Sequence, residues 1–192
     1  MKRFTGLLLC VLLLAGCTKD DGLDRAMSAR SKFQSTACRF RATVSADYGD
    51  MIHTFVMDCE ADKLGNVEFL VVAPDAISGI TGKLTGGSGF LTFDREILAF
   101  ELLADGQLSP VSAPWVLIST LRGGYLRYAA ETQQGLRLTV DDSYEDEPMQ
   151  VDIWLEGDIP VEAEILWQGR RILTLRVEKF AFLEQNDDSG IG

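Results

Sequence analysis

The strongest constraint on the fold of this chain is an alternation of apolar and polar side chains with a period of two. In residues 136–141, Leu136, Leu138 and Val140 alternate with polar residues, and residues 149–156 repeat the pattern. Such alternation is typical of β-strands that bury one face. Short glycine-containing turns separate the segments. The predicted strands are residues 37–46, 51–61, 67–73, 77–85, 89–94, 96–103, 125–132, 136–141, 149–156, 161–167 and 171–182.

This pattern predicts a mainly β protein: a curled antiparallel sheet, or unclosed β-barrel, of about eleven strands with one or two helices covering its concave face. A helix is expected over residues 110–122, because Ser109-Pro110 is a helix start signal and Gly123-Gly124 a stop signal. It is apolar on nearly every side, so we expect it inside the concavity; a twelfth buried strand is the alternative. A short amphipathic helix is also expected from Leu23, because one helix face would carry Leu23, Ala26, Met27, Arg30 and Phe33. Near Glu178-Lys179 the apolar parity slips, which indicates a bulge or a strand end.

The first residues have the layout of a bacterial export signal. Two cations precede a short apolar run that ends in Leu14-Ala15-Gly16-Cys17, which resembles a lipobox. We therefore expect cleavage before Cys17, whose sulfur would carry a diacylglyceryl group; an ordinary secretory peptide cut elsewhere is the alternative. The expected organisation is a signal peptide over 1–16, a lipidated cysteine and tether over 17–22, one half-barrel domain over 23–185, and a flexible acidic tail over 186–192.

Charge limits the partners of the mature protein. Without Lys2 and Arg3, 16 of the 18 basic residues remain against 29 acidic ones, a net charge of about −13. Such a chain repels nucleic acid and anionic lipid headgroups. Attachment to the membrane would then depend on the acyl chains of Cys17, since two chains suffice for stable anchoring. The expected location is extracytoplasmic, at the bacterial cell membrane.

Two cysteines remain in the mature fold, Cys38 and Cys59. If Tyr48-Gly49 forms the two-residue loop of a hairpin, these cysteines lie directly opposite each other in a non-hydrogen-bonded pair. The same register places Arg39 opposite Asp58. A disulfide is then favoured in an oxidising compartment. Two buried free thiols are the alternative.

No catalytic or metal site is evident from the sequence. His53 is the only histidine, which excludes most triad and metal sites. Gly86-Gly87-Ser88-Gly89 leads into a strand rather than a helix, so it lacks the helix N-terminus of a phosphate site. The acidic run 141–147 lacks EF-hand spacing, and a solvated hairpin tip explains it better than calcium. We therefore expect no enzyme activity and no cofactor.

The order of elements resembles the outer-membrane lipoprotein carrier and receptor superfamily, with related Gram-positive lipoproteins. The similar stretches are the N-terminal helix, the strands around Tyr48-Gly49, residues 65–69 leading to 73–75, the hairpin of Phe93-Asp94 and Leu98, and residues 163–165, 172–177 and 180–182. The resemblance implies an unclosed antiparallel barrel with an apolar cavity for acyl chains or another lipid. The soluble carriers lack a lipid anchor, whereas this chain has Cys17, which favours a tethered receptor or scaffold.

Two functions from different classes follow. In the first, the half-barrel binds a lipid or a lipidated protein in a cavity. The candidate lining residues are Phe40, Phe55, Phe69, Phe93, Phe100, Trp115 and Ile118. In the second, these residues fill a core, and the protein is a cell-surface interaction module that uses its acidic outer face or Trp154.

Overall fold

The computed structural model describes residues 21–85, 91–93, 103–106, 108–144 and 147–183. Predictions that concern Cys17, Phe100 or the tail 186–192 lie outside these residues. The elements are α2 (Asp21–Ser35), β1 (Ala37–Asp47), β2 (Ile52–Ala61), β3 (Val67–Ala73), the 3-10 turn η2 (Asp75–Ile77), β4 (Thr81–Leu84), β5 (Leu91–Phe93), the 3-10 turn η4 (Pro110–Ser112), α3 (Ala113–Gly123), β6 (Tyr125–Thr132), β7 (Gly135–Asp141), β8 (Gln150–Glu156), β9 (Ile159–Trp167) and β10 (Arg170–Leu183). No helix in this part of the chain is long and apolar enough to span a bilayer.

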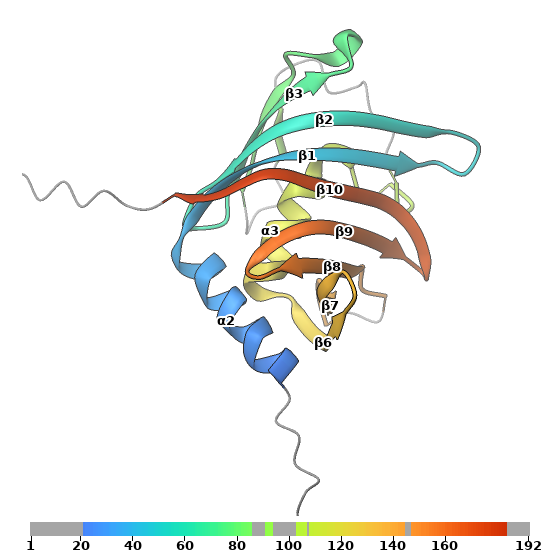
Figure 1. The fold of residues 1–192 in the computed structure, drawn as a ribbon. Helices are drawn as coiled ribbons and strands as arrows, with labels where there is room; N and C mark the ends of the chain where they lie inside the picture. Colours follow the sequence, from blue (N-terminus) through green and yellow to red (C-terminus); the bar gives the residue numbers. More distant parts are fainter. Residues whose placement is uncertain (1–20, 86–90, 94–102, 107, 145–146, 184–192) are drawn as a thin grey trace, which may run out of the picture.

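Within the described residues, ten strands form one antiparallel sheet in the order β5-β4-β3-β2-β1-β10-β9-β8-β7-β6. Strands β1 and β10 pair at the centre of this order, and β5 and β6 are its two ends. The sheet curls around α3 (Figure 1). The predicted fold class, a mainly β curled and unclosed sheet, is confirmed, and so is its antiparallel pairing.

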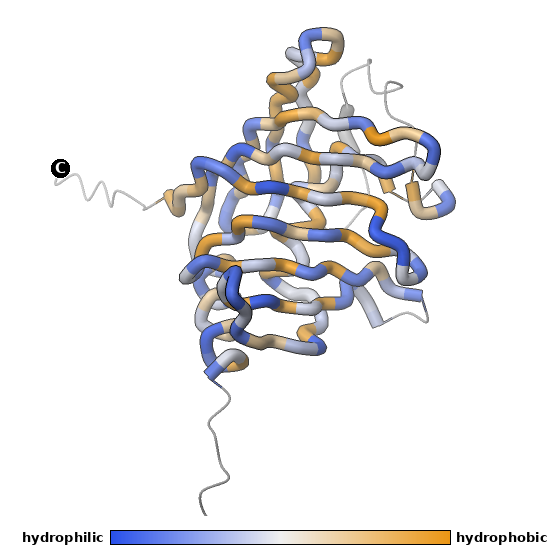
Figure 2. Tube along the Cα trace, turned by 45° about the vertical axis from the view of Figure 1, so that its right-hand side comes forward, coloured by the Kyte–Doolittle hydropathy of each residue, from blue (hydrophilic) through white to orange (hydrophobic). Residues whose placement is uncertain are grey.

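The period-two pattern marks the buried face of almost every strand. On β1, positions 38, 40, 42, 44 and 46 are all buried, and the intervening positions reach solvent. On β7 and β8, Leu136, Leu138, Ile153 and Leu155 face the same core. Figure 2 shows the resulting alternation of apolar and polar residues along the central strands. One sheet face is therefore packed and the other is wet, as predicted.

Helix α3 lies against the packed face. It contacts α2 and the strands β2, β8 and β10, which come from both halves of the sheet. Leu117 and Ile118 are fully buried, and Trp115 and Ser119 are half-buried. The predicted helix over 110–122 is thus confirmed, preceded by the turn η4. A helix that is apolar on nearly every side is stable only where its side chains are removed from water, and the concave side of the sheet provides that environment.

Helix α2 begins at Asp21, inside the segment predicted as a tether. Its buried face consists of Gly22, Ala26, Ala29 and Phe33. Leu23 and Met27, which the spacing of the sequence placed on the buried face, are about half exposed instead.

The parity slip near the C-terminus is a bulge. Lys179 has a φ of 52°, and the pairing of β10 with β1 shifts where Arg39 faces Ala181 but Arg41 faces Glu178. The extra residue returns Phe180 and Phe182 to the packed side of the sheet, where both are half-buried against the core.

One strand prediction differs from the structure, and two others fall partly outside the described residues. Residues 77–85 form a strand only over β4, because η2 ends at Ile77 and a turn follows, in which Gly79 has a φ of 94°. Of the predicted strand 89–94, the described residues 91–93 form β5. The predicted strand 96–103 lies outside the described residues except for Leu103, which forms an isolated bridge with Leu108.

The predicted register of the β1–β2 hairpin is wrong by two residues. The loop is Gly49-Asp50, closed by a hydrogen bond from Tyr48 N to Met51 O of 3.0 Å. Gly49 adopts a φ of 96°, which favours glycine, and its amide donates to Asp47 Oδ1 at 2.7 Å. The turn is therefore centred one residue later than Tyr48-Gly49.

This shift separates the cysteines. Cys38 lies opposite Ala61, and Cys59 lies opposite Phe40. Arg41, rather than Arg39, pairs with Asp58. Cys38 and Cys59 are free and buried, so the predicted disulfide is replaced by the alternative of two buried thiols. A disulfide needs cysteines whose side chains meet directly, which a diagonal position two residues away does not provide.

Candidate binding surfaces

The candidate cavity residues lie in or next to the packed core. Phe40, Phe55, Phe69 and Ile118 are each at most 4% exposed and belong to one cluster that spans the sheet and α3. Trp115 is half-buried against that cluster. Phe93 belongs to β5, and Phe100 lies outside the described residues. The sheet therefore brings the predicted residues of β1, β2, β3 and α3 to one face.

Four phenylalanines form an aromatic cluster at the end of this core where α2 meets β1 and β10. The ring of Phe33 lies 5.8 Å from that of Phe180 and 5.1 Å from that of Phe182. Phe40 stacks on Phe180 at 5.9 Å. Lys32 Nζ lies 4.4 Å from the centre of the Phe182 ring. Edge-to-face contacts of this kind stabilise beyond the area they bury. The cluster depends on the bulge at Lys179, which the sequence did signal.

Two arginines join the helices, because each of them caps the C-terminal end of the other helix. Arg30 of α2 donates from Nη2 to Gly124 O at 2.7 Å and from Nε to Leu121 O at 3.2 Å, at the end of α3. Arg122 of α3 donates to Phe33 O near the end of α2 and to Lys63 O at 2.7 Å in the β2–β3 turn. The last carbonyls of a helix have no intrahelical donors, so these side chains supply the missing hydrogen bonds. A cation at this end also interacts favourably with the negative end of the helix dipole. Sequence reasoning missed this arrangement.

The buried thiols are unreactive by environment. Burial raises the pKa of Cys38 to about 12, although Arg122 acts in the opposite direction. Burial also raises the pKa of Cys59, with Asp58 adding to the effect. Because the thiolate is the nucleophile and the metal ligand, neither cysteine is suited to covalent catalysis at neutral pH.

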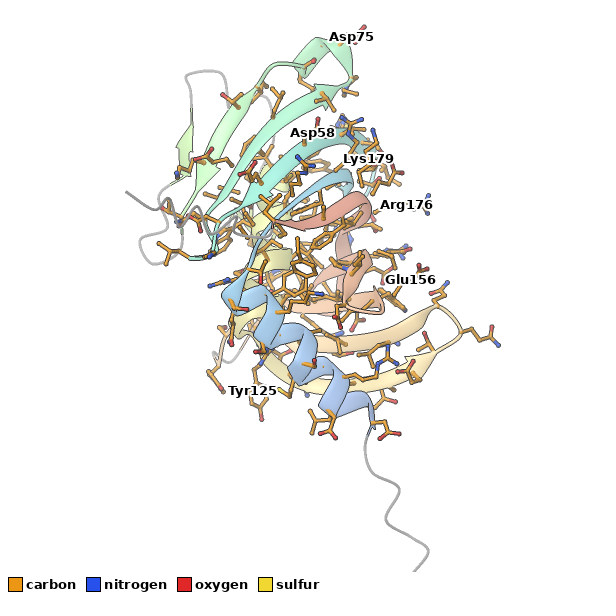
Figure 3. All side chains as sticks on the ribbon, turned by 60° about the vertical axis from the view of Figure 1, so that its left-hand side comes forward. Asp58, Asp75, Tyr125, Glu156, Arg176 and Lys179 are labelled. Carbon is orange, nitrogen blue, oxygen red and sulfur yellow. The ribbon has the colours of Figure 1, made fainter. Side chains whose placement is uncertain are left out.

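The outer face of the sheet carries a groove of about 830 Å³ across β10, β1, β2, β3 and β4. Its charged lining residues are Arg39, Arg41, Asp58, Glu60, Glu68, Lys83 and Lys179. Leu70 and Ala181 add apolar surface. Figure 3 shows Asp58 and Lys179 on this side of the sheet. Phe40, Cys59 and Phe69, whose side chains are buried in the core, also line the groove. Its charged side chains on β1, β2 and β3 come from outward-facing positions, so the groove opens on the outer face.

Cross-strand ion pairs hold the groove side chains in place. Arg41 binds Asp58 through two bonds of 2.6 Å, and this interaction lowers the pKa of the Asp58 carboxyl. Lys83 binds Glu68 at 2.6 Å on the neighbouring pair of strands. Two-point arginine–carboxylate contact fixes geometry as well as charge. The groove therefore presents a set pattern of charges.

His53, Trp154 and Trp167 each contact a neighbouring side chain. His53 is exposed near the start of β2, where the centre of its ring lies 5.5 Å from that of Tyr48. Trp154 is half-buried under the guanidinium of Arg137, at 5.3 Å. Trp167 donates from Nε1 to Asp105 Oδ2 at 3.2 Å. Across the described residues, no three histidine, cysteine or acidic side chains are grouped so that they could hold a metal ion.

No family model and no curated protein matches this chain. Similar solved structures include an uncharacterised conserved protein from Thermus thermophilus, with 12% identity, a TM-score of 0.44, and coverage of 85% of this chain and 88% of that one. A LolA superfamily protein from Nitrosomonas europaea has 9% identity, a TM-score of 0.39, and coverage of 84% and 95%. A putative outer membrane lipoprotein-sorting protein domain from Vibrio parahaemolyticus has 9% identity, a TM-score of 0.36, and coverage of 88% and 96%. At these values, none of them assigns a function to this chain.

Proposed function

We propose that this protein is a lipid-anchored, extracytoplasmic binding module without catalytic activity, held at the membrane through Cys17. The half-barrel would hold a polypeptide partner on its outer face rather than a ligand in its concavity. The observation that carries the proposal is the position of the groove, which lies on the wet face of the sheet, while α3 covers the packed face.

The packed face of the described part has the character of a filled core. Phe55, Met57, Leu173 and Leu175 from the central strands are each at most 1% exposed, as is Leu117 of α3. Such side chains contact each other rather than solvent, and protein interiors pack to the density of organic crystals. This supports the interaction module over an open acyl-chain cavity.

The groove has the features of a protein-binding surface. Its rim is charged, with Arg39 and Lys179 exposed and Arg41 paired with Asp58. Leu70 supplies an exposed apolar side chain within it. Protein interfaces combine an apolar centre with a polar rim, whereas a site for an acyl tail is lined mainly by apolar groups.

A photo-crosslinking amino acid at Leu70 tests this proposal in cells that make the protein. Ile159 is the matched control, because both side chains are 39% exposed and apolar, and only Leu70 lies in the groove. We expect a discrete crosslinked protein from position 70 and none from position 159. Equal patterns from the two positions, or none from either, would count against the outer groove as the binding surface.

A lipid ligand is the second candidate, and the aromatic cluster is the observation that favours it. Phe180 and Phe182 are half-buried rather than buried, and they lie at one end of the packed face. Native mass spectrometry of a Cys17→Ser protein from a lipid-containing host distinguishes the candidates. A copurified lipid that is lost on substituting Phe180 would establish the second function; a ligand-free mass supports the first.

A further inference from the structure

The N-terminal helix and the first strand after α3 together expose apolar and aromatic side chains at one end of the molecule. We infer that this surface, formed by Leu23 and Met27 of α2 with Tyr125 and Tyr144, rests on the bilayer that holds Cys17. We call it the α2–β6 surface. The inference rests on the proposed lipid anchor and adds an orientation to it.

Leu23 and Met27 are unusual for an amphipathic helix because they are 45% and 50% exposed. They are four residues apart, so they lie on one flank of α2, next to the buried face of Gly22, Ala26 and Ala29. Exposing large apolar side chains to water is unfavourable, so a group of them on a helix flank indicates a surface that something else covers.

Arg30 connects this flank to the start of β6. It follows Met27 by three residues, so it lies on the same side of the helix. Its guanidinium reaches Gly124 O at 2.7 Å, directly before Tyr125. The Tyr125 and Tyr144 rings lie 5.0 Å apart and are 49% and 87% exposed. Figure 3 shows Tyr125 beside α2 at the lower end of the molecule.

The short segment between Cys17 and α2 identifies the bilayer as the partner of the α2–β6 surface. Asp21, where α2 begins, follows Cys17 by only four positions in the sequence. Four residues span at most about 14 Å. Met27 lies six residues further along the helix, a rise of about 9 Å. A lipidated Cys17 therefore holds this end of α2 near the bilayer surface.

The chemistry of the surface fits the membrane interface. Tyrosine is enriched at headgroup level, where its ring is partly in apolar surroundings and its hydroxyl remains hydrated. Interfacial helices bury leucine-type side chains to a depth of about 5–10 Å. Acidic residues Asp21 and Asp24 in the first turn of α2 argue against attraction to anionic lipid, so the contact would depend on apolar burial.

In this orientation, the β1–β2 turn points away from the bilayer. The turn lies at the far end of β1 from α2 (Figure 1). Eleven residues of β1 cover about 35 Å at the rise of a β-strand. Ile52, at that turn, is 68% exposed and provides a matched apolar control position.

The test uses the full-length lipoprotein, purified after processing and reconstituted into phosphatidylcholine vesicles. Flotation of the wild type but not of Cys17→Ser first establishes the anchor. Leu23→Trp, Tyr125→Trp and Ile52→Trp proteins are then compared in vesicles with brominated acyl chains, which quench nearby indoles. The three native tryptophans are common to all and are subtracted with the wild type.

We expect loss of the added emission in the Leu23→Trp and Tyr125→Trp proteins, and no loss in the Ile52→Trp protein. Equal emission at all three positions would overturn the inference while leaving the anchor intact, and so would quenching at only one of the two surface positions. A wild type that fails to float would contradict the proposed anchor itself.

Discussion

Replacing Arg30 by methionine tests whether the reciprocal capping of α2 and α3 stabilises the fold. The variant keeps an apolar stem but removes the donors to Leu121 O and Gly124 O. Each hydrogen bond to a charged group is worth about 1.5–3 kcal/mol in its net contribution. The Arg30 guanidinium is partly solvated, and the freed carbonyls gain some access to water, so the expected loss is about 2–4 kcal/mol.

The assay is urea unfolding of the mature chain without its lipid, followed by circular dichroism and tryptophan emission. With a slope of about 2 kcal/mol per molar urea, the midpoint should fall by roughly 1–2 M. Coincident transitions of the two probes would justify a two-state treatment. The slope itself should stay unchanged, because the substitution barely alters the surface that is exposed on unfolding.

Arg25→Met is the matched control on the same helix. Arg25 makes an ion pair with Glu131 of β6, and both side chains are about half exposed. Exposed pairs of this kind contribute at most about 1 kcal/mol. If Arg30→Met costs no more than Arg25→Met, the capping of α3 contributes nothing beyond a surface charge, and the argument fails.

Three further predictions concern the sheet. Burial raises the pKa of Cys38 to about 12, so the two buried thiols should resist alkylation at pH 8 until urea is added. They should then react without reductant. A need for reductant would indicate a disulfide. Gly82→Ala should destabilise by about 1–3 kcal/mol, because its Cβ would lie 2.6 Å from the Phe69 ring, and the penalty measured by urea unfolding should shrink in a Phe69→Ala background; an unchanged penalty would point to the backbone instead. Hydrogen bonding to Arg41 lowers the pKa of Asp58 in the folded state. The stabilisation by this pair is therefore present above the unfolded pKa of about 4 and is lost as the pH falls through the lower folded pKa. The acid limb of a stability–pH curve should flatten in Arg41→Met, and an identical limb would contradict the pairing.

The sequence alone determined most of the strands and their buried faces, although not the turn after β3 or the exposure of Leu23 and Met27. Alternation with a period of two is a local property, so it identified the strands and which side chains leave water. The helix over 110–122 followed from its Ser109-Pro110 start, its glycine stop and its apolar surface on nearly every side. The bulge at Lys179 was visible because a single inserted residue reverses the parity of everything after it.

The hairpin register was decided only by the tertiary structure. The predicted and observed pairings of β1 with β2 differ by two residues, a shift that leaves every side chain on the same face of the sheet. Alternation therefore cannot distinguish them. The choice depends on the turn at Gly49-Asp50, and it separates Cys38 from Cys59.

The candidate binding surfaces show the same division. The sequence indicated that Phe40, Phe55 and Phe69 share a face, because alternation assigns faces within each strand. It predicted that the helix over 110–122 lies in the concavity, but not which strands that helix contacts, nor that a groove crosses the outer face. Both depend on contacts between segments far apart in the chain, such as Arg30 with Gly124. Local periodicity determined what is buried, and only the assembled sheet decided what the buried residues meet and which surface remains open to a partner.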